Sequence, residues 1–150
     1  MPDHRPPNAE PPPDAGGRNR RGAARIARWG WPLLVAAVIF HASSRSVVAA
    51  PGGIQVNDKL AHFCAYGLLA SLVLRAFGGG GWRGAVAAVL LVSAYGASDE
   101  WHQSFVPGRN CEFADWVADT SGAMLAVSLY LWCAPYRRLL EAPLGRRKAA

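Results

Sequence analysis

The chain has 150 residues, of which 51% are hydrophobic, and its 16 basic and 10 acidic residues give a formal net charge of +6. This length suits one domain of ordinary size. Three scattered cysteines are too few for a disulfide framework or a cysteine-based zinc site, so a disulfide-rich secreted domain is excluded. Because the basic residues lie in tails and short loops rather than on one folded face, we expect no nucleic-acid partner.

Residues 1–28 are predicted to form a disordered cytoplasmic tail. The segment is rich in proline and arginine and has few large apolar side chains, so burial cannot offset the entropy lost on ordering it. Residues 29–136 carry most of the tryptophan, leucine, valine and phenylalanine, and we expect them to form the folded domain. Residues 137–150 are predicted to be a second, basic cytoplasmic tail.

Four stretches of the predicted domain, residues 29–44, 60–74, 84–98 and 120–136, contain no Asp, Glu, Lys or Arg. Each is slightly shorter than the roughly 18–20 residues of a simple membrane span. A soluble helical bundle requires a charged outer face on every helix, and these stretches have none. We therefore predict an all-α integral membrane protein, a bundle of four transmembrane helices, in which snorkelling flanks and modest bilayer thinning compensate for the short spans.

The first stretch also fits a cleaved secretory signal. Basic residues precede a short apolar segment at 31–40, and Val48, Ala49 and Ala50 follow as small residues. The long preceding tail, and Arg45 within the would-be cleavage region, favour a retained helix instead.

The distribution of basic residues predicts the orientation. With four spans both termini lie on one side, together with 13 of the 16 basic residues, and only Arg45, Lys59 and Arg109 lie on the other. By the positive-inside rule both termini are cytoplasmic, and the chain is a multi-pass protein of the plasma membrane. The acidic residues cluster on the outer side: Asp58, Asp99, Glu100, Glu112, Asp115 and Asp119.

Ionisable residues at membrane depth are costly, so they usually face the bundle interior and mark a functional site. Asp58, His62 and Tyr66 recur every four residues and share one helix face, and Asp115 and Asp119 share a face of another helix. We expect these side chains to converge in a polar pocket that opens outward. The candidate binding residues are Asp58, Lys59, His62, Tyr66, Glu100, Gln103, Arg109, Asp115 and Asp119.

The residue types in this set suit several kinds of chemistry. We expect Arg109 to pair with Asp115 or Glu100, and Lys59 to pair with an acid across the bundle. Both cations could engage a phosphate or carboxylate. If the chain is an enzyme, His62 and Glu100 are the candidate catalytic residues, although the sequence has no nucleophile–base motif such as HExxH or GxSxG.

No cofactor or metal is expected from the sequence. A divalent metal bound by His62, His102 and nearby carboxylates is an alternative, but their spacing is not specific for a metal site. The polar residues could also serve only to tie the helix ends together.

Residues 58–71 and 98–123 resemble the VanZ-like family of small bacterial membrane proteins, and the similarity covers about residues 33–134. The matching positions are Asp58, Lys59, His62, Phe63, Tyr66, Leu69, Asp99, Glu100, Gln103, Pro107, Gly108, Arg109, Asp115 and Gly122. Asp119 stands where the family usually has Asn, which adds a charge.

The resemblance implies a bacterial cell-envelope protein from a family named for a member linked to teicoplanin resistance. Our leading hypothesis is a non-enzymatic protein whose pocket binds a membrane lipid headgroup, a lipid-linked cell-wall precursor or a lipophilic glycopeptide. One alternative is a hydrolase or transferase acting on a lipid-linked phosphate or sugar. The other is a structural or regulatory membrane subunit.

Overall fold

The computed structural model describes residue 22 and residues 26–45, 58–79, 81–109 and 111–142. These residues contain no strand, and the prediction of an all-α fold is confirmed. The helices are α2 (Gly30–Ser43), α3 (Asp58–Ala76), α4 (Gly81–Gln103), α5 (Phe113–Trp132) and α6 (Ala134–Glu141). Most of the predicted tail at 1–28 and the alternative cleavage site at 48–50 lie outside the described residues.

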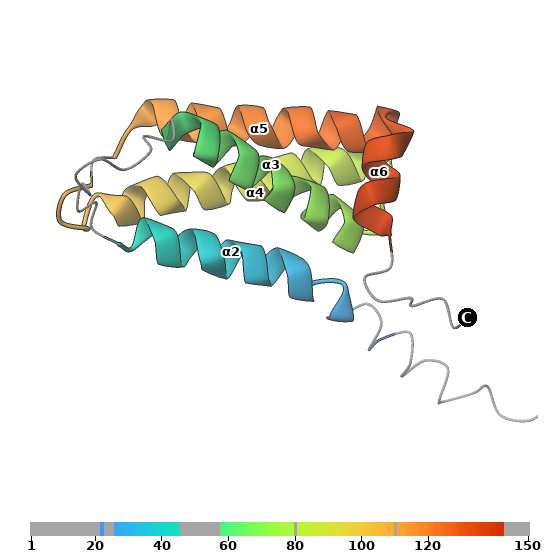
Figure 1. The fold of residues 1–150 in the computed structure, drawn as a ribbon, viewed down its shortest axis with the longest axis horizontal. Coiled ribbons are helices and arrows are strands. Elements are labelled where there is room, and N and C mark those ends of the chain that lie inside the picture. The colour runs from blue at the N-terminus through green and yellow to red at the C-terminus, as the bar shows by residue number, and fades with distance from the viewer. Residues whose placement is uncertain (1–21, 23–25, 46–57, 80, 110, 143–150) are drawn as a thin grey trace, which may run out of the picture.

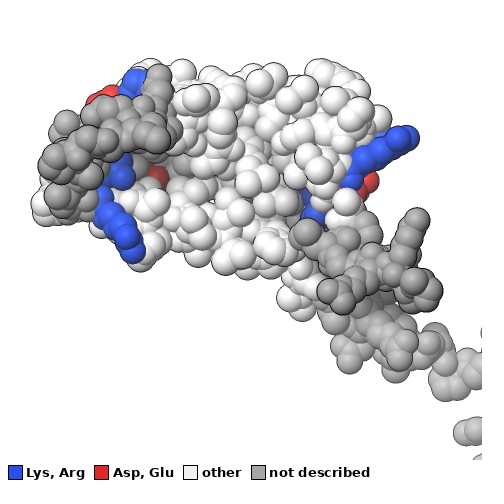
Figure 2. Space-filling model, viewed as in Figure 1, with Lys and Arg blue, Asp and Glu red and all other residues white. Residues whose placement is uncertain are grey.

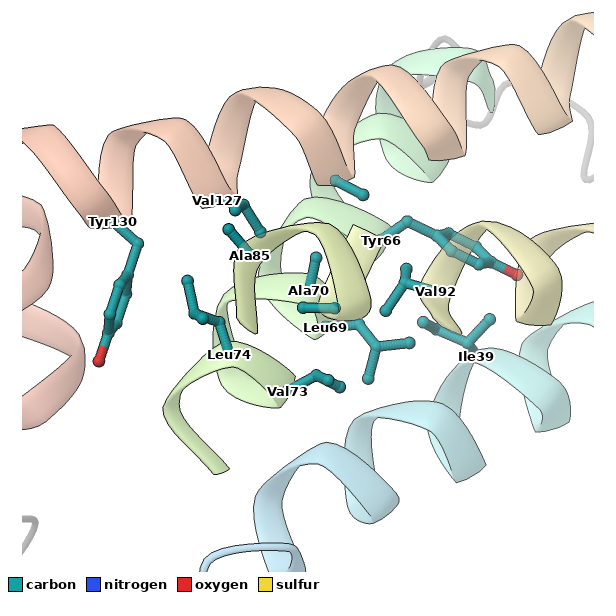
Figure 3. Close-up of a cluster of buried hydrophobic side chains, with 12 residues drawn as sticks. Ile39, Tyr66, Leu69, Ala70, Val73, Leu74, Ala85, Val92, Val127 and Tyr130 are labelled. Atoms are coloured by element: carbon teal, nitrogen blue, oxygen red, sulfur yellow. The ribbon is translucent and has the colours of Figure 1, made fainter. Parts of the chain in front are cut away.

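Helices α2 to α5 run along the long axis of the molecule, and α6 crosses one end of it (Figure 1). Helix α3 packs most extensively against α5, and also against α4 and α2. Its buried side chains Tyr66, Leu69 and Val73 form one apolar core with Ile39 of α2 and Val92 of α4 (Figure 3). Because α3 contacts three neighbours, its position decides where the other helices can place their polar side chains.

The contact between α3 and α5 is unusually close. Small residues allow it: a Cβ atom added to Gly122 would lie 2.1 Å from the carbonyl oxygen of Phe63, and one added to Gly67 would lie 3.0 Å from the carbonyl oxygen of Gly122. Ala123 and Ala126 of α5 are buried beside them. Glycine and alanine at such a crossing let two helix backbones approach each other, as is common in membrane helix pairs.

Glycine and proline residues determine the conformation of two connections between helices. Gly78, Gly79 and Gly81 have positive φ angles, so they make the tight turn between α3 and α4 without steric cost. The stretch 120–136, predicted to be one span, is instead broken, because α5 ends at Trp132 and α6 bends away by 97°. The physical reason is Pro135, which cannot continue a helix and sits in the first turn of α6.

Helix α6 is anchored to the end of the other helices. Tyr130 donates a hydrogen bond to Glu141 at 2.7 Å, and the Ser71 and Tyr136 hydroxyls lie 3.0 Å apart. The guanidinium group of Arg75 donates to the carbonyl oxygen of Leu140. The folded part of the chain therefore extends past residue 136, the boundary predicted from hydropathy.

By length and composition, α3 can cross a membrane over Lys59–Ala76, and α5 with α6 adds a second candidate if the bent pair is one span. Helix α2 is apolar but shorter. Among the described residues the remaining long helix, α4, does not meet the same criterion.

The Gly122→Ala substitution is expected to lower the free energy of unfolding by about 1–3 kcal/mol, the usual cost of overpacking a tight interior. The added methyl group would collide with the backbone of α3, which cannot move without separating the two helices. Thermal unfolding of the purified protein in detergent measures the change.

Gly84→Ala is the matched control, since its Cβ atom would meet only a Leu74 methyl group at 3.4 Å. This variant should unfold at the same temperature as the wild type or slightly above it, because alanine favours helix. Equal stability of the two variants would contradict the close α3–α5 contact.

Candidate functional site

The polar side chains converge at the end of the molecule where α2 and α4 finish and α3 and α5 start. Because these four helix ends meet at one end of the molecule, residues far apart in sequence form one network, which we call the polar cluster. Its members are Ser43, Lys59, His62, Tyr66, Asp99, Glu100, Gln103, Asp115 and Asp119. The backbone of Asp58 begins α3, but its side chain lies outside the described part of the structure.

Asp99 joins three helices through one carboxylate oxygen. Its Oδ2 atom accepts hydrogen bonds from Ser43 Oγ at 2.6 Å, Tyr66 OH at 2.9 Å and Gln103 Nε2 at 3.2 Å. Asp99 is buried, and these three donors stabilise one oxygen of its carboxylate, while the other oxygen, Oδ1, has no hydrogen-bond partner among the described residues. Asp99 was not among the predicted binding residues, although its position next to Glu100, in the segment that resembles the VanZ-like family, could have indicated it.

Lys59 fulfils the expectation that it pairs with an acid across the bundle. Its Nζ atom lies 2.8 Å from Asp115 Oδ1 and 2.8 Å from Glu112 Oε2. Asp115 is buried, whereas Glu112 is exposed. The backbone N–H of Glu112 in turn donates to Glu100 Oε2 at 2.9 Å, so the start of α5 is linked to the end of α4.

His62 and Asp119 form the second link between α3 and α5. The His62 Nδ1 atom lies 2.9 Å from Asp119 Oδ1, and the His62 ring stacks parallel to Tyr66 with centroids 6.0 Å apart. Asp119 is fully buried because Gly96 of α4 leaves room for it. A Cβ atom at Gly96 would lie 2.8 Å from Asp119 Oδ2.

One group of side chains in the described residues has the arrangement of metal ligands. His62, Glu100 and Asp119 each offer one ligand atom, and these atoms lie within 4.8 Å of one another. His102, which the sequence suggested as a ligand, is not in this group. Its Nε2 atom lies 3.0 Å from Ser44 Oγ, and its ring stacks on Phe40.

The predicted pairing of Arg109 with Asp115 or Glu100 is wrong: no ion pair among the described residues joins them. The guanidinium group donates to the carbonyl oxygens of Ala42 at 3.3 Å and Arg45 at 3.4 Å instead. Ala42 lies in the last turn of α2 and Arg45 lies two residues beyond its end, where the helix dipole favours a cation.

A cavity of about 140 Å³ lies between α2 and α3, next to the polar cluster. It is lined by Ile39, Ala42, Ser43, Ala61, His62, Ala65, Tyr66 and Arg109. One half of this lining is apolar and the other half offers hydroxyl, imidazole and guanidinium groups. We call this cavity the amphipathic pocket.

Tyr66→Phe should lower the free energy of unfolding by about 1.5–3 kcal/mol, since it removes a hydrogen bond to the carboxylate of Asp99. Tyr95→Phe is the control, because its hydroxyl donates to the neutral carbonyl oxygen of Ala36 and should cost only about 0.5–1.5 kcal/mol. Unfolding in detergent measures both. A smaller loss for Tyr66→Phe than for the control would show that Asp99 is not the charged centre of the cluster.

A family model described as VanZ/LLP1 matches residues 19–134. None of the curated proteins and none of the solved structures compared with the chain matches it. The matched residues include α2 to α5, and therefore every helix that contributes to the polar cluster. The resemblance noted in the sequence is confirmed, and the chain belongs to the VanZ/LLP1 family.

Proposed function

We propose that this chain is a multi-pass protein of the bacterial plasma membrane, a four-helix bundle with both termini in the cytoplasm. Its amphipathic pocket opens to the outer face and binds the headgroup of a membrane lipid or of a lipid-linked cell-wall precursor. The observation that carries this proposal is a small cavity, lined by both apolar and polar side chains, next to a cluster of buried ionisable side chains.

The outer surface of the helices supports the membrane location. Large apolar side chains are exposed along the middle of the long helices, among them Leu34 of α2, Leu68 of α3, Leu90 of α4 and Leu125 of α5. Figure 2 shows the charged side chains at the two ends of the visible face and none across its middle. A surface of this kind is costly in water and is suited to acyl chains.

The orientation rests on the basic residues. At the end opposite the polar cluster lie Arg28, Arg75, Arg83 and Arg137, in keeping with the side predicted to be cytoplasmic. Trp82 and Trp132 are exposed near that end, where amphipathic rings favour the membrane–water interface. The polar cluster would then lie at the outer interface.

The pocket lining suits a molecule with a polar head on an apolar tail. Arg109 and His62 offer hydrogen bonds to phosphate or sugar oxygens, and Ser43 Oγ, which donates its proton to Asp99, can accept a hydrogen bond from a sugar hydroxyl. Ile39 and Ala65 offer an apolar wall to the adjoining carbon chain. A lipophilic glycopeptide also combines a polar part with an apolar chain. We therefore expect the protein to alter the susceptibility of the cell to glycopeptides of the teicoplanin type.

Ala65→Leu should empty the pocket of its ligand, because the larger side chain fills the cavity from its apolar wall. Native mass spectrometry of the protein purified in mild detergent measures which lipids remain bound. We expect the wild type to retain a lipid or lipid-linked precursor that Ala65→Leu loses. Ala87→Leu is the control, since Ala87 is exposed on α4 and does not line the pocket.

The same variants test the cellular effect. A deletion strain carrying the wild type or Ala87→Leu should differ from one carrying Ala65→Leu when challenged with a panel of envelope-targeting antibiotics that includes glycopeptides. If Ala65→Leu keeps its lipid and its phenotype while Tyr66→Phe lowers only stability, the polar cluster has a structural or regulatory role.

The His62–Asp119 contact favours one further candidate function. A carboxylate that orients an imidazole is typical of a general base, which would suit a hydrolase or transferase acting on a lipid-linked phosphate or sugar. Turnover of a polyprenyl phosphate by the purified protein, abolished by His62→Ala but retained by the exposed-site variant His41→Ala, would establish this function. Absence of turnover in the wild type would remove it.

A further inference from the structure

His62, Glu100 and Asp119 come from three different helices, α3, α4 and α5, yet offer ligand atoms within 4.8 Å of one another. Ligand atoms that bind one ion at about 2.0–2.2 Å lie at most about 4.4 Å apart. A side-chain movement of a few tenths of an ångström therefore brings all three within reach of a single ion. The sequence did not show this, because only the fold places Glu100 beside the other two.

Two carboxylate oxygens of this group lack hydrogen-bond partners. Glu100 Oε1 and Asp119 Oδ2 are both buried, and no hydrogen bond reaches them among the described residues. The two residues are 4% and 0% exposed. Buried polar atoms are nearly always paired, and an unpaired carboxylate oxygen is among the most costly to bury, so their presence points to a ligand.

The charges of the group are only partly compensated, since Asp119 contacts an imidazole, that of His62, rather than a permanent cation. Lys59 pairs with Asp115 and Glu112, and no Lys or Arg in the described part of the chain forms an ion pair with Glu100 or Asp119. The neighbouring buried carboxylate, Asp99, adds to the acidic excess. A divalent cation would compensate both carboxylates at once, and the alternative of bound protons is an outcome of the test below.

We infer that His62, Glu100 and Asp119 form a binding site for a divalent metal ion of the Zn²⁺ or Mn²⁺ type. One imidazole and two carboxylates suit these ions, whereas Ca²⁺ takes six to eight oxygen ligands. His62 also lines the amphipathic pocket, so the proposed site adjoins that cavity. The site depends on these three side chains and not on what the pocket binds.

The test uses the full chain in lipid nanodiscs, stripped of metal with a chelator and then titrated with Zn²⁺ or Mn²⁺. Elemental analysis after dialysis should find one ion per chain. Glu100→Gln and Asp119→Asn should each weaken binding by at least about 100-fold, more than the loss of an outer-shell partner. The ion should also raise the unfolding temperature of the wild type and not that of the two variants.

Glu112→Gln is the control, because it removes an exposed carboxylate at the same end of the molecule that is not one of the three proposed ligands. This variant should bind the ion as the wild type does. Equal binding by all the variants would overturn the inference. If a variant fails to fold, metal binding by the wild type still tests the inference. Its failure to bind either ion in a one-to-one complex would mean that the two carboxylates hold protons instead.

Discussion

The close contact of α3 with α5 determines where the polar side chains of both helices lie. Gly67 and Gly122 let the two backbones approach, and both helices start at the same end of the molecule. This parallel arrangement puts His62 against Asp119 and, one turn nearer the helix starts, Lys59 against Asp115. A bulkier residue at the crossing would separate both pairs, so packing in the apolar part of the bundle controls the geometry of the polar part.

Much of this could be predicted from the sequence. Stretches without charge predicted helices, and the spaced polar residues from Asp58 to Gly122 identified the family. The partner of Arg109 could not be predicted, because charge favoured an acid while the carbonyl groups at the end of α2 compete for the same guanidinium group. Hydropathy alone also did not show that a separate helix, α6, begins beside Pro135, since the residues on both sides of it are apolar.

The buried acidic side chains differ in the partners they have, and this difference determines where we place the proposed chemistry. Asp99 accepts three hydrogen bonds on Oδ2 and Asp115 has Lys59, so these two hold the helices together, although Asp99 Oδ1 has no partner among the described residues. Glu100 and Asp119 each keep a buried oxygen without a partner. Proteins seldom retain such groups for stability alone, which is why the proposed chemistry is assigned to this side of the cluster and to the adjoining pocket.

Side chains from separate helices act on one another directly in the polar cluster, and a double-mutant cycle of His62→Ala and Asp119→Ala measures this interaction as free energies of unfolding in lipid. We expect a coupling energy of about 0.5–3 kcal/mol, as for residues in contact. Additivity of the two losses to within about 0.3–0.5 kcal/mol would contradict it, because residues that do not share partners behave in that way.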